Sequence, residues 1–151
     1  MNPPEKIKIL LIDDDEIIRI YFQDVFWIYG LDKKFELNIV NDIKEGEKII
    51  NDPKTKPDIV FLDLVMPIKE NGRTVVSPES SFAMLKKIKT DPNLQKIKVI
   101  IFSGHSEKSF IDKAKELGAE DYIIKGENMP KEVAEYIEKI AKDYQTNEAS
   151  H

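Results

Sequence analysis

The sequence predicts an α/β domain in which one doubly wound parallel sheet of five strands carries helices on both faces. Short runs rich in Ile and Val alternate with longer amphipathic stretches five times along the 151 residues. The runs lack the polar alternation of half-exposed strands, which is typical of parallel strands buried on both faces. Right-handed crossovers through the intervening helices then give an open sheet, and the chain length fits a single domain.

The five apolar runs are the expected strands. Each is short for a helix and contains the β-branched residues that favour strands. They lie at Ile7–Ile12, Leu37–Val40, Ile59–Leu62, Val99–Phe102 and Tyr122–Ile124.

Two of the expected helices end at a glycine. Gly30 ends the first, at about 16–29, and Gly118 ends the fourth, at about 106–117, because glycine readily adopts left-handed backbone at a helix C-terminus. Asp15 precedes the first helix and is expected to cap it.

The other helices are placed by capping residues and by proline. Asp42 and Glu45 have the spacing of a capping box at the start of a short second helix. Ser77 is expected to cap the third helix with Pro78 at its first position, and the fifth helix follows Pro130.

The domain is expected to cover residues 1–144, with a polar, disordered tail at 145–151. Two connections are long, at 30–36 and at 66–77, and long loops in a compact domain are commonly functional. Because only this tail follows the fifth helix, we expect the output to be contact with another protein or self-association.

Composition and charge exclude several function classes. With 23 Lys and Arg against 28 Asp and Glu, the net charge is −5, so the chain lacks the basic excess that direct nucleic-acid binding needs. The absence of cysteine removes disulfides, thiol catalysis and zinc–thiolate sites. No apolar run approaches the ~18 residues of a membrane span and the N-terminus lacks a signal-peptide pattern, so we expect no membrane insertion and a cytoplasmic location.

Ligand sites of doubly wound sheets lie at the carboxyl ends of the strands, so the residues directly after the strands are the candidates for chemistry. After the first, third, fourth and fifth runs these are Asp13, Asp14 and Asp15, then Asp63, Ser103 and Lys125. Crowded carboxylates repel one another unless a cation lies between them, and Mg²⁺ is a hard ion that binds carboxylate and phosphate oxygens. One carboxylate can then attack a phosphoryl group while the ammonium and the hydroxyl offset charge on its oxygens.

Four motifs, in order along the chain, resemble the response-regulator receiver domain of two-component signalling. They are ILLIDDDEIIR, DIVFLDLVMP, VIIFSGH and AEDYIIKG, and the resemblance covers about residues 6–144. It implies a flavodoxin-like sheet with the strand order 2-1-3-4-5, in a receiver of the stand-alone type.

The resemblance also implies a phosphoacceptor beside a magnesium site. Asp63 matches the phosphoacceptor, and Asp13 and Asp14 match the acidic pair at Mg²⁺, with Asp14 the more direct ligand. Asp63 itself and the main-chain carbonyl of Val65 are the other implied metal ligands.

Three further residues match the machinery of the family. Ser103 matches the hydroxyl that meets the phosphoryl group, Lys125 its counterion and Tyr122 the switch aromatic.

The implied function is a signalling switch: Asp63 takes a phosphoryl group from a histidine kinase or a histidine phosphotransfer protein. The surface of the fourth helix, fifth strand and fifth helix then changes for a downstream protein or a second copy. Such a domain catalyses only its own phosphorylation and dephosphorylation.

The chain departs from the family pattern at two places. Gly126 follows Lys125, where the family commonly has a proline with a cis peptide bond. The loop 66–77 is enlarged and carries Lys69 and Arg73 beside the expected site, where it could gate that site or contact a partner.

Three other functions fit some of the same residues. A haloacid-dehalogenase-type phosphatase would use Asp13 as its nucleophile in an Asp-x-Asp motif with Asp15, and Ser103 and Lys125 in later motifs. That interpretation leaves Asp63 unused and lacks a further acidic pair after the fifth strand. A receiver-like binding module that is never phosphorylated fits the two departures. A flavodoxin-like cofactor binder is disfavoured because no glycine-rich or hydroxyl-rich phosphate loop follows the first strand.

Overall fold

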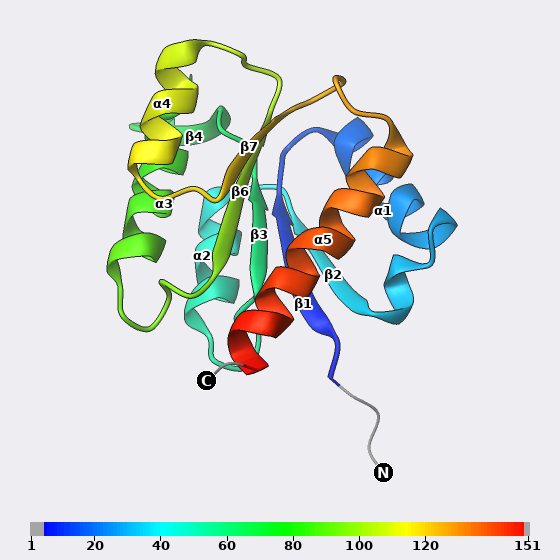
Figure 1. Ribbon diagram of the computed structural model, residues 1–151. Coiled ribbons are helices and arrows are strands. Elements are labelled where there is room, and N and C mark those ends of the chain that lie inside the picture. The colour runs from blue at the N-terminus through cyan, green and yellow to red at the C-terminus, as the bar shows by residue number, and fades with distance from the viewer. Residues whose placement is uncertain (1–4, 150–151) are drawn as a thin grey trace.

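A parallel sheet of five strands forms the centre of the structure (Figure 1). The structure is a computed structural model that describes residues 5–149. The strands stand in the order β2-β1-β3-β6-β7, and every neighbouring pair is parallel. Counted among themselves they have the order 2-1-3-4-5, so the predicted topology is confirmed. Their bounds are Ile7–Ile12 for β1, Phe35–Val40 for β2, Ile59–Leu62 for β3, Lys98–Ser103 for β6 and Asp121–Ile124 for β7.

Helices cover both faces of the sheet, as expected. Figure 1 shows α1 and α5 on one face and α2, α3 and α4 on the other. A short 3₁₀ helix occupies the connection between α1 and β2. The bounds are Glu16–Ile28 for α1, Leu31–Lys33 for the 3₁₀ helix, Ile43–Asn51 for α2, Glu79–Thr90 for α3, Lys108–Glu116 for α4 and Pro130–Ala149 for α5.

The last helix is longer than the sequence predicted. Residues 145–149 continue α5 instead of forming a disordered tail, and residues 150–151 lie outside the described part of the chain. Polar residues such as Gln, Glu and Lys are good helix formers, so polarity alone does not mark a helix end. Within residues 5–149, no helix combines the length and the apolar content needed to cross a lipid bilayer.

Two apolar cores lie between the sheet and its helices. Successive strand side chains point to opposite faces, so Leu11 joins the core under α1 and α5 and Leu10 joins the core under α2, α3 and α4. In the first core, the ring of Phe22 in α1 packs edge to face on Phe61 and Phe102, with centroids 5.3 and 5.2 Å away. These contacts hold the carboxyl ends of β3 and β6 against α1.

The expected long loop at 66–77 is instead a β-hairpin. β4 (Met66–Glu70) and β5 (Arg73–Ser77) pair antiparallel as a separate two-stranded sheet. The two residues that join them, Asn71 and Gly72, have φ angles of 51° and 77°. Positive φ at both central positions is what a type I′ hairpin turn requires, and an Asn-Gly pair between two strands is its strongest sequence signal. The expectation of a loop overlooked that signal.

Helix starts follow the predicted caps, with one shift. Asp15 and Asp42 each accept a hydrogen bond from a backbone N–H of the first turn, at 2.9 and 2.7 Å, which confirms both caps. The third helix begins one residue later than predicted, since Pro78 is the N-cap and α3 starts at Glu79. Ser77 Oγ still accepts a hydrogen bond from the Glu79 N–H, at 3.1 Å.

Candidate functional site

Three carboxylates converge at the carboxyl edge of the sheet. Asp13 directly follows β1 and Asp63 directly follows β3, and these two strands are paired neighbours. One carboxylate oxygen from each of Asp13, Asp14 and Asp63 lies within 4.8 Å of those of the other two. Asp13 is fully buried, Asp63 is 6% exposed, and Asp14 is exposed to solvent. The aspartates that the sequence placed on one edge therefore do meet.

The ammonium group of Lys125 faces two of these carboxylates. Lys125 Nζ lies 2.8 Å from Asp13 Oδ2 and 3.4 Å from Asp63 Oδ2. The backbone N–H of Lys125 donates to the carbonyl oxygen of Ser103 at 2.8 Å, which fixes the end of β7 beside β6. One ammonium therefore contacts both buried carboxyls of this group of three.

Burial and mutual repulsion raise the pKa values of both buried carboxyls. Removal from water and then the nearby charge of Asp13 raise the pKa of Asp63 to about 7, against the charge and the hydrogen bonding of Lys125, which lower it. Burial likewise raises the pKa of Asp13, against hydrogen bonding to Lys125 and to the Asp15 N–H. When its three carboxyls are ionised, the site therefore carries more negative charge than Lys125 neutralises.

Hydrogen bonds to the backbone hold the two buried aspartates in place. Asp13 Oδ1 accepts from the Asp15 N–H at 2.9 Å, within the turn that starts α1. The Asp63 N–H donates to the carbonyl oxygen of Ile12 at 2.9 Å, and the Ser81 hydroxyl donates to the Asp63 carbonyl oxygen at 2.9 Å. Ser81 is fully buried in α3 and was not predicted, because a serine inside a helix gives no sequence signal of its partner.

The predicted hydroxyl and the predicted switch aromatic both bond to the backbone of His105. Ser103 is fully buried, and its Oγ accepts from the His105 N–H at 3.1 Å. The Tyr122 hydroxyl donates to the His105 carbonyl oxygen at 2.6 Å. Partial burial raises the pKa of Tyr122, which keeps its hydroxyl a donor. His105 lies in the loop after β6, and the role of its main chain was not predicted.

Two other predicted features lie beside this cluster. Val65 stands two residues after Asp63, between the buried side chains of Leu64 and Met66, and its carbonyl remains a predicted ligand. Gly126 has a φ of 85°, and no neighbouring atom would meet an added Cβ within 4 Å. Residues 5–149 contain no cis peptide bond.

The donor set suits a hard divalent cation. Its oxygens come from carboxylates, and their spacing of under 4.8 Å allows one ion to contact all three. A dication there would offset the excess negative charge that raises the pKa of Asp63. Carboxylate-only sites without histidine or thiolate favour Mg²⁺, Mn²⁺ or Ca²⁺ over zinc.

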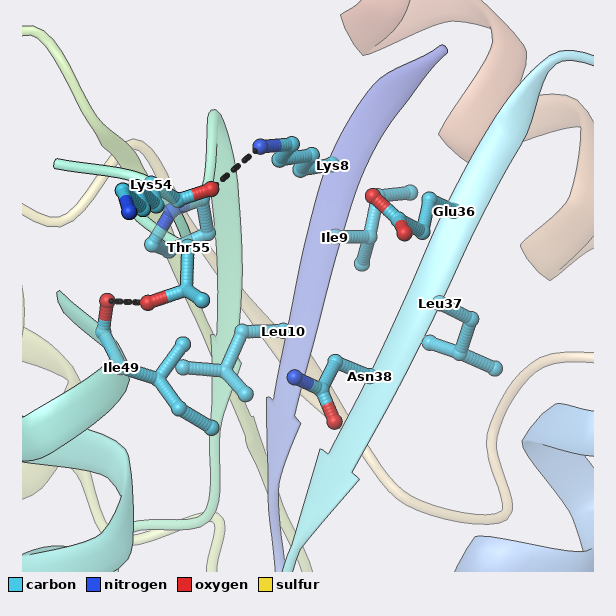
Figure 2. A pocket seen from close by; sticks show the side chains of 10 residues that line it. Lys8, Ile9, Leu10, Glu36, Leu37, Asn38, Ile49, Lys54 and Thr55 are labelled. Atoms are coloured by element: carbon cyan, nitrogen blue, oxygen red, sulfur yellow. Dashed lines mark hydrogen bonds between the residues drawn. The ribbon is translucent and has the colours of Figure 1, made fainter. Parts of the chain in front are cut away.

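Another hollow lies on the amino-terminal half of the sheet, away from these aspartates. Figure 2 shows it between the first residues of β1 and β2 and the segment before β3, with a volume of about 320 Å³. Two of its polar side chains bond within the chain: Lys8 Nζ donates to the Lys54 carbonyl oxygen and Thr55 Oγ1 to that of Ile49. The convergence of charged groups at the carboxyl edge makes that edge the stronger candidate site.

The sheet order and the acidic edge define a doubly wound α/β protein with a candidate cation and phosphoryl site. Comparison with known families makes this specific: residues 9–138 match the response regulator receiver domain, and the chain belongs to that family. Domains of this family are regulatory phosphoacceptors of two-component systems that interact with histidine kinases and downstream effectors, and they bind Mg²⁺ or Mn²⁺ at an acidic pocket.

Curated relatives are distant and differ in length. The probable chemotaxis protein CheY of Rhizobium etli is 26% identical over 83% of this chain and 85% of its own length. A protein-glutamate methylesterase/protein-glutamine glutaminase of Clostridium acetobutylicum is 28% identical over 95% of this chain but only 38% of its own length. The two-component response regulator-like APRR3 of Arabidopsis thaliana is 26% identical over 82% of this chain and 22% of its own length. The chain thus spans well under half of two of these relatives.

Solved structures share the fold. The phosphorylated cyanobacterial phytochrome response regulator RcpA superposes with a TM-score of 0.71 and 22% identity, over 95% of this chain and 96% of its own. The receiver domain of a LuxO repressor protein from Vibrio parahaemolyticus gives a TM-score of 0.75 at 18% identity, over 97% and 98% of the two chains. At these identities the likeness establishes the fold alone.

Proposed function

We propose that this chain is a phosphoaccepting signalling switch in which Asp63 takes a phosphoryl group from a phosphohistidine of a histidine kinase or histidine phosphotransfer protein. The observation that carries the proposal is the convergence of Asp13, Asp14 and Asp63 around the single ammonium of Lys125, at the carboxyl edge of a receiver fold. Crowded carboxylates repel one another when they are ionised, so this cluster suits a reaction that adds a cation and a phosphoryl group.

In the proposed reaction, a carboxylate oxygen of Asp63 attacks the phosphorus of the donor. The P–N bond to the donor imidazole breaks, its electron pair returns to the ring nitrogen, and the aspartyl acyl phosphate forms. Lys125 lies close enough to Asp63 to offset charge on the transferred oxygens. Asp13, Asp14, Asp63 and the Val65 carbonyl would hold Mg²⁺, which supplies positive charge that keeps the carboxylates ionised and stabilises the phosphoryl oxygens.

Ser103 would transmit the conformational change from the phosphorylated site to the surface. Its Oγ accepts the His105 N–H in this structure, and the same hydroxyl would donate to a phosphoryl oxygen on Asp63. That movement would release the His105 N–H, and the carbonyl oxygen of the same residue accepts the Tyr122 hydroxyl, so the backbone of His105 would couple Ser103 to Tyr122. Phosphorylation would then shift the population between two packings of the α4, β7 and α5 surface, for a downstream protein or a second copy.

We propose no catalysis beyond this phosphorylation and its reversal. In the phosphatase alternative, Asp15 would be a second acid, but its carboxylate accepts the Ile17 N–H as the cap of α1. Asp13, the nucleophile of that alternative, is buried and paired with Lys125. Neither observation favours phosphatase chemistry over the use of Asp63.

Intact-mass analysis with acetyl phosphate and Mg²⁺ tests the proposal. We expect a gain of one phosphoryl group that peptide mapping assigns to Asp63, complete loss in Asp63→Asn, and loss on chelation of Mg²⁺. Asp24→Asn, at an exposed carboxylate of α1, is the matched control and should label normally. Labelling that persists in Asp63→Asn, or that needs no metal, would overturn the assignment, and turnover of a phosphomonoester by Asp63→Asn would support the phosphatase.

A further inference from the structure

The β4–β5 hairpin leaves specific backbone groups on its outer edges. Its two-residue turn makes Glu70 and Arg73 a hydrogen-bonded pair, and hydrogen-bonded and non-hydrogen-bonded pairs then alternate along the ladder. Lys69 is therefore paired with Thr74 without hydrogen bonds, as is Pro67 with Val76. At these pairs the backbone N–H and C=O groups point away from the hairpin.

The two edges of the hairpin are not equivalent. On the β4 edge, Pro67 occupies an outward-facing position and has no N–H to donate. β4 also lies against α3 and begins with the fully buried Met66. On the β5 edge, the outward-facing residues are Thr74 and Val76, each with a free N–H and C=O. Only β5 therefore offers an edge that can accept another strand.

The β5 edge is accessible and has the composition of a strand interface. Val76 is 63% exposed, and Thr74 is exposed as well. Within residues 5–149, no backbone hydrogen bond from outside the hairpin reaches either residue. Thr74, Val75 and Val76 are all β-branched, which favours strand pairing. An uncovered edge of this kind is a template for a further strand.

We propose that a second copy of this chain pairs with this edge, β5 against β5 in antiparallel orientation, to give a four-stranded sheet across a two-fold axis. Centred on Val75, the pairing sets Thr74 opposite the partner's Val76, and Arg73 opposite the partner's Ser77. Both Thr74–Val76 pairs become hydrogen-bonded pairs, so every open group of the two residues finds a partner. No like charges face one another across the axis.

Pairing of two β5 strands limits the assembly to a dimer. The two-fold pairing consumes both β5 edges, and Pro67 blocks the β4 edges that remain outside. Growth therefore stops at a dimer and does not continue into a filament. A single strand pair buries far less than the roughly 1,600 Å² of a typical stable interface, so we expect weak, concentration-dependent association.

Analytical ultracentrifugation over a wide concentration range tests the proposal. Val76→Pro removes the outward N–H while leaving the internal pairs of the hairpin, and Pro67 directly opposite shows that proline fits such a position. We expect it to weaken association at least about tenfold, because two hydrogen bonds are lost per dimer. Val76→Thr keeps the N–H and the β-branched shape but reduces the apolar surface, and should dimerise like the parent chain.

Amide hydrogen exchange gives an independent readout that does not depend on a variant. The amides of Thr74 and Val76 should exchange more slowly as concentration rises, whereas that of Val75, bonded inside the hairpin, should not change. In Val76→Pro the concentration dependence at Thr74 should disappear, while the Val75 amide reports that the hairpin is still folded.

Several results would overturn the proposal. A monomer at every concentration, or a dimer that Val76→Pro leaves intact, would show that β5 is not the interface. Loss of association in Val76→Thr would point to apolar contact in place of strand pairing. Binding of an extended segment of another protein without self-association would assign the edge to a different occupant. The inference is independent of the phosphorylation chemistry, and Val76→Pro should incorporate phosphate at Asp63 like the parent chain.

Discussion

Two lysine–carboxylate clusters lie at opposite ends of the same parallel strands. At the amino end, Lys89 pairs with Glu120 and donates to the Ile97 carbonyl oxygen at 2.6 Å. The second oxygen of Glu120 accepts the Val99 N–H, so this pair ties α3 to the starts of β6 and β7. At the carboxyl end, Lys125 meets Asp13 and Asp63 together.

The difference between the clusters is their charge balance. Lys89 has one carboxylate partner, Glu120, so the charges of this cluster balance. Backbone carbonyl oxygens accept the other hydrogen bonds of its ammonium group. Lys125 contacts two carboxylates with that of Asp14 close by, and the pKa of Asp63 rises to about 7 as a result of burial and the Asp13 charge. An ion pair whose charges cancel stabilises the contact between two elements. A cluster with excess negative charge can instead bind a cationic ligand.

The largest effect should come from removing each lysine in turn and following phosphate incorporation from acetyl phosphate. Lys125→Met should lower the rate by about 100-fold or more, since the charge that offsets the phosphoryl oxygens is lost. Lys89→Met should change the rate by less than about twofold once folding is confirmed by circular dichroism. Equal losses in both variants would show that the two clusters do not differ in role.

The pH dependence of unfolding should reveal the unbalanced cluster directly. In the native state Asp63 keeps its proton up to about pH 7, whereas the unfolded chain releases it near pH 3.8. The native state thus binds more protons in this window, and the metal-free protein should lose on the order of 4 kcal/mol from this group as pH rises through it.

Urea titrations at several pH values measure this loss. Asp63→Asn should remove most of the slope and raise the free energy of unfolding at neutral pH, and Asp24→Asn should leave the slope unchanged. A slope that survives in Asp63→Asn would place the raised pKa elsewhere.

The Lys89–Glu120 cluster should instead contribute to the free energy of unfolding. Lys89→Met leaves Glu120 without its cation next to the Val99 N–H, and should lower the free energy of unfolding by about 2 kcal/mol, less than for a fully buried pair because both side chains keep some exposure. Chemical denaturation measures it, with Lys86→Met, at an exposed lysine of α3, as the control. A change in Lys89→Met no larger than in Lys86→Met would show that the cluster is not a structural tie.

Binding of magnesium should change the free energy of unfolding least of all, and only when the acidic site is intact. At about ten times its dissociation constant, Mg²⁺ should add about 1.4 kcal/mol of stability at pH 8 and less at pH 5.5, where protons compete for Asp63. Thermal denaturation with and without Mg²⁺ measures it, and Asp13→Asn should abolish the gain. An equal gain in Asp13→Asn would mean that the ion binds elsewhere.

The sequence predicted the site better than it predicted the loops around it. Asp13 and Asp63 were identifiable because each directly follows an apolar run, and parallel strands carry their carboxyl ends to one edge. Both aspartates were therefore predicted from their position relative to a strand. They lie close together because β1 and β3 are neighbours in the sheet.

The hairpin and the supporting hydrogen bonds were harder to predict. The strands of the hairpin contain Lys69, Glu70 and Arg73, so they lack the apolar run that marked the other strands, and only the Asn-Gly turn indicated them. Ser81 and the main chain of His105 act through contacts that depend on three-dimensional packing, for which one sequence carries no pattern.

The ladder of the hairpin pairs Met66 with Ser77, so the chain leaves the end of β3 and returns beside its point of departure before α3 begins. A segment whose ends already meet can be gained, shortened or replaced while the strand and helix that flank it keep their positions. The exposed Asn71–Gly72 tip is accordingly a natural place to graft a peptide tag or reporter, because an insertion there would leave the paired ends of the hairpin in place.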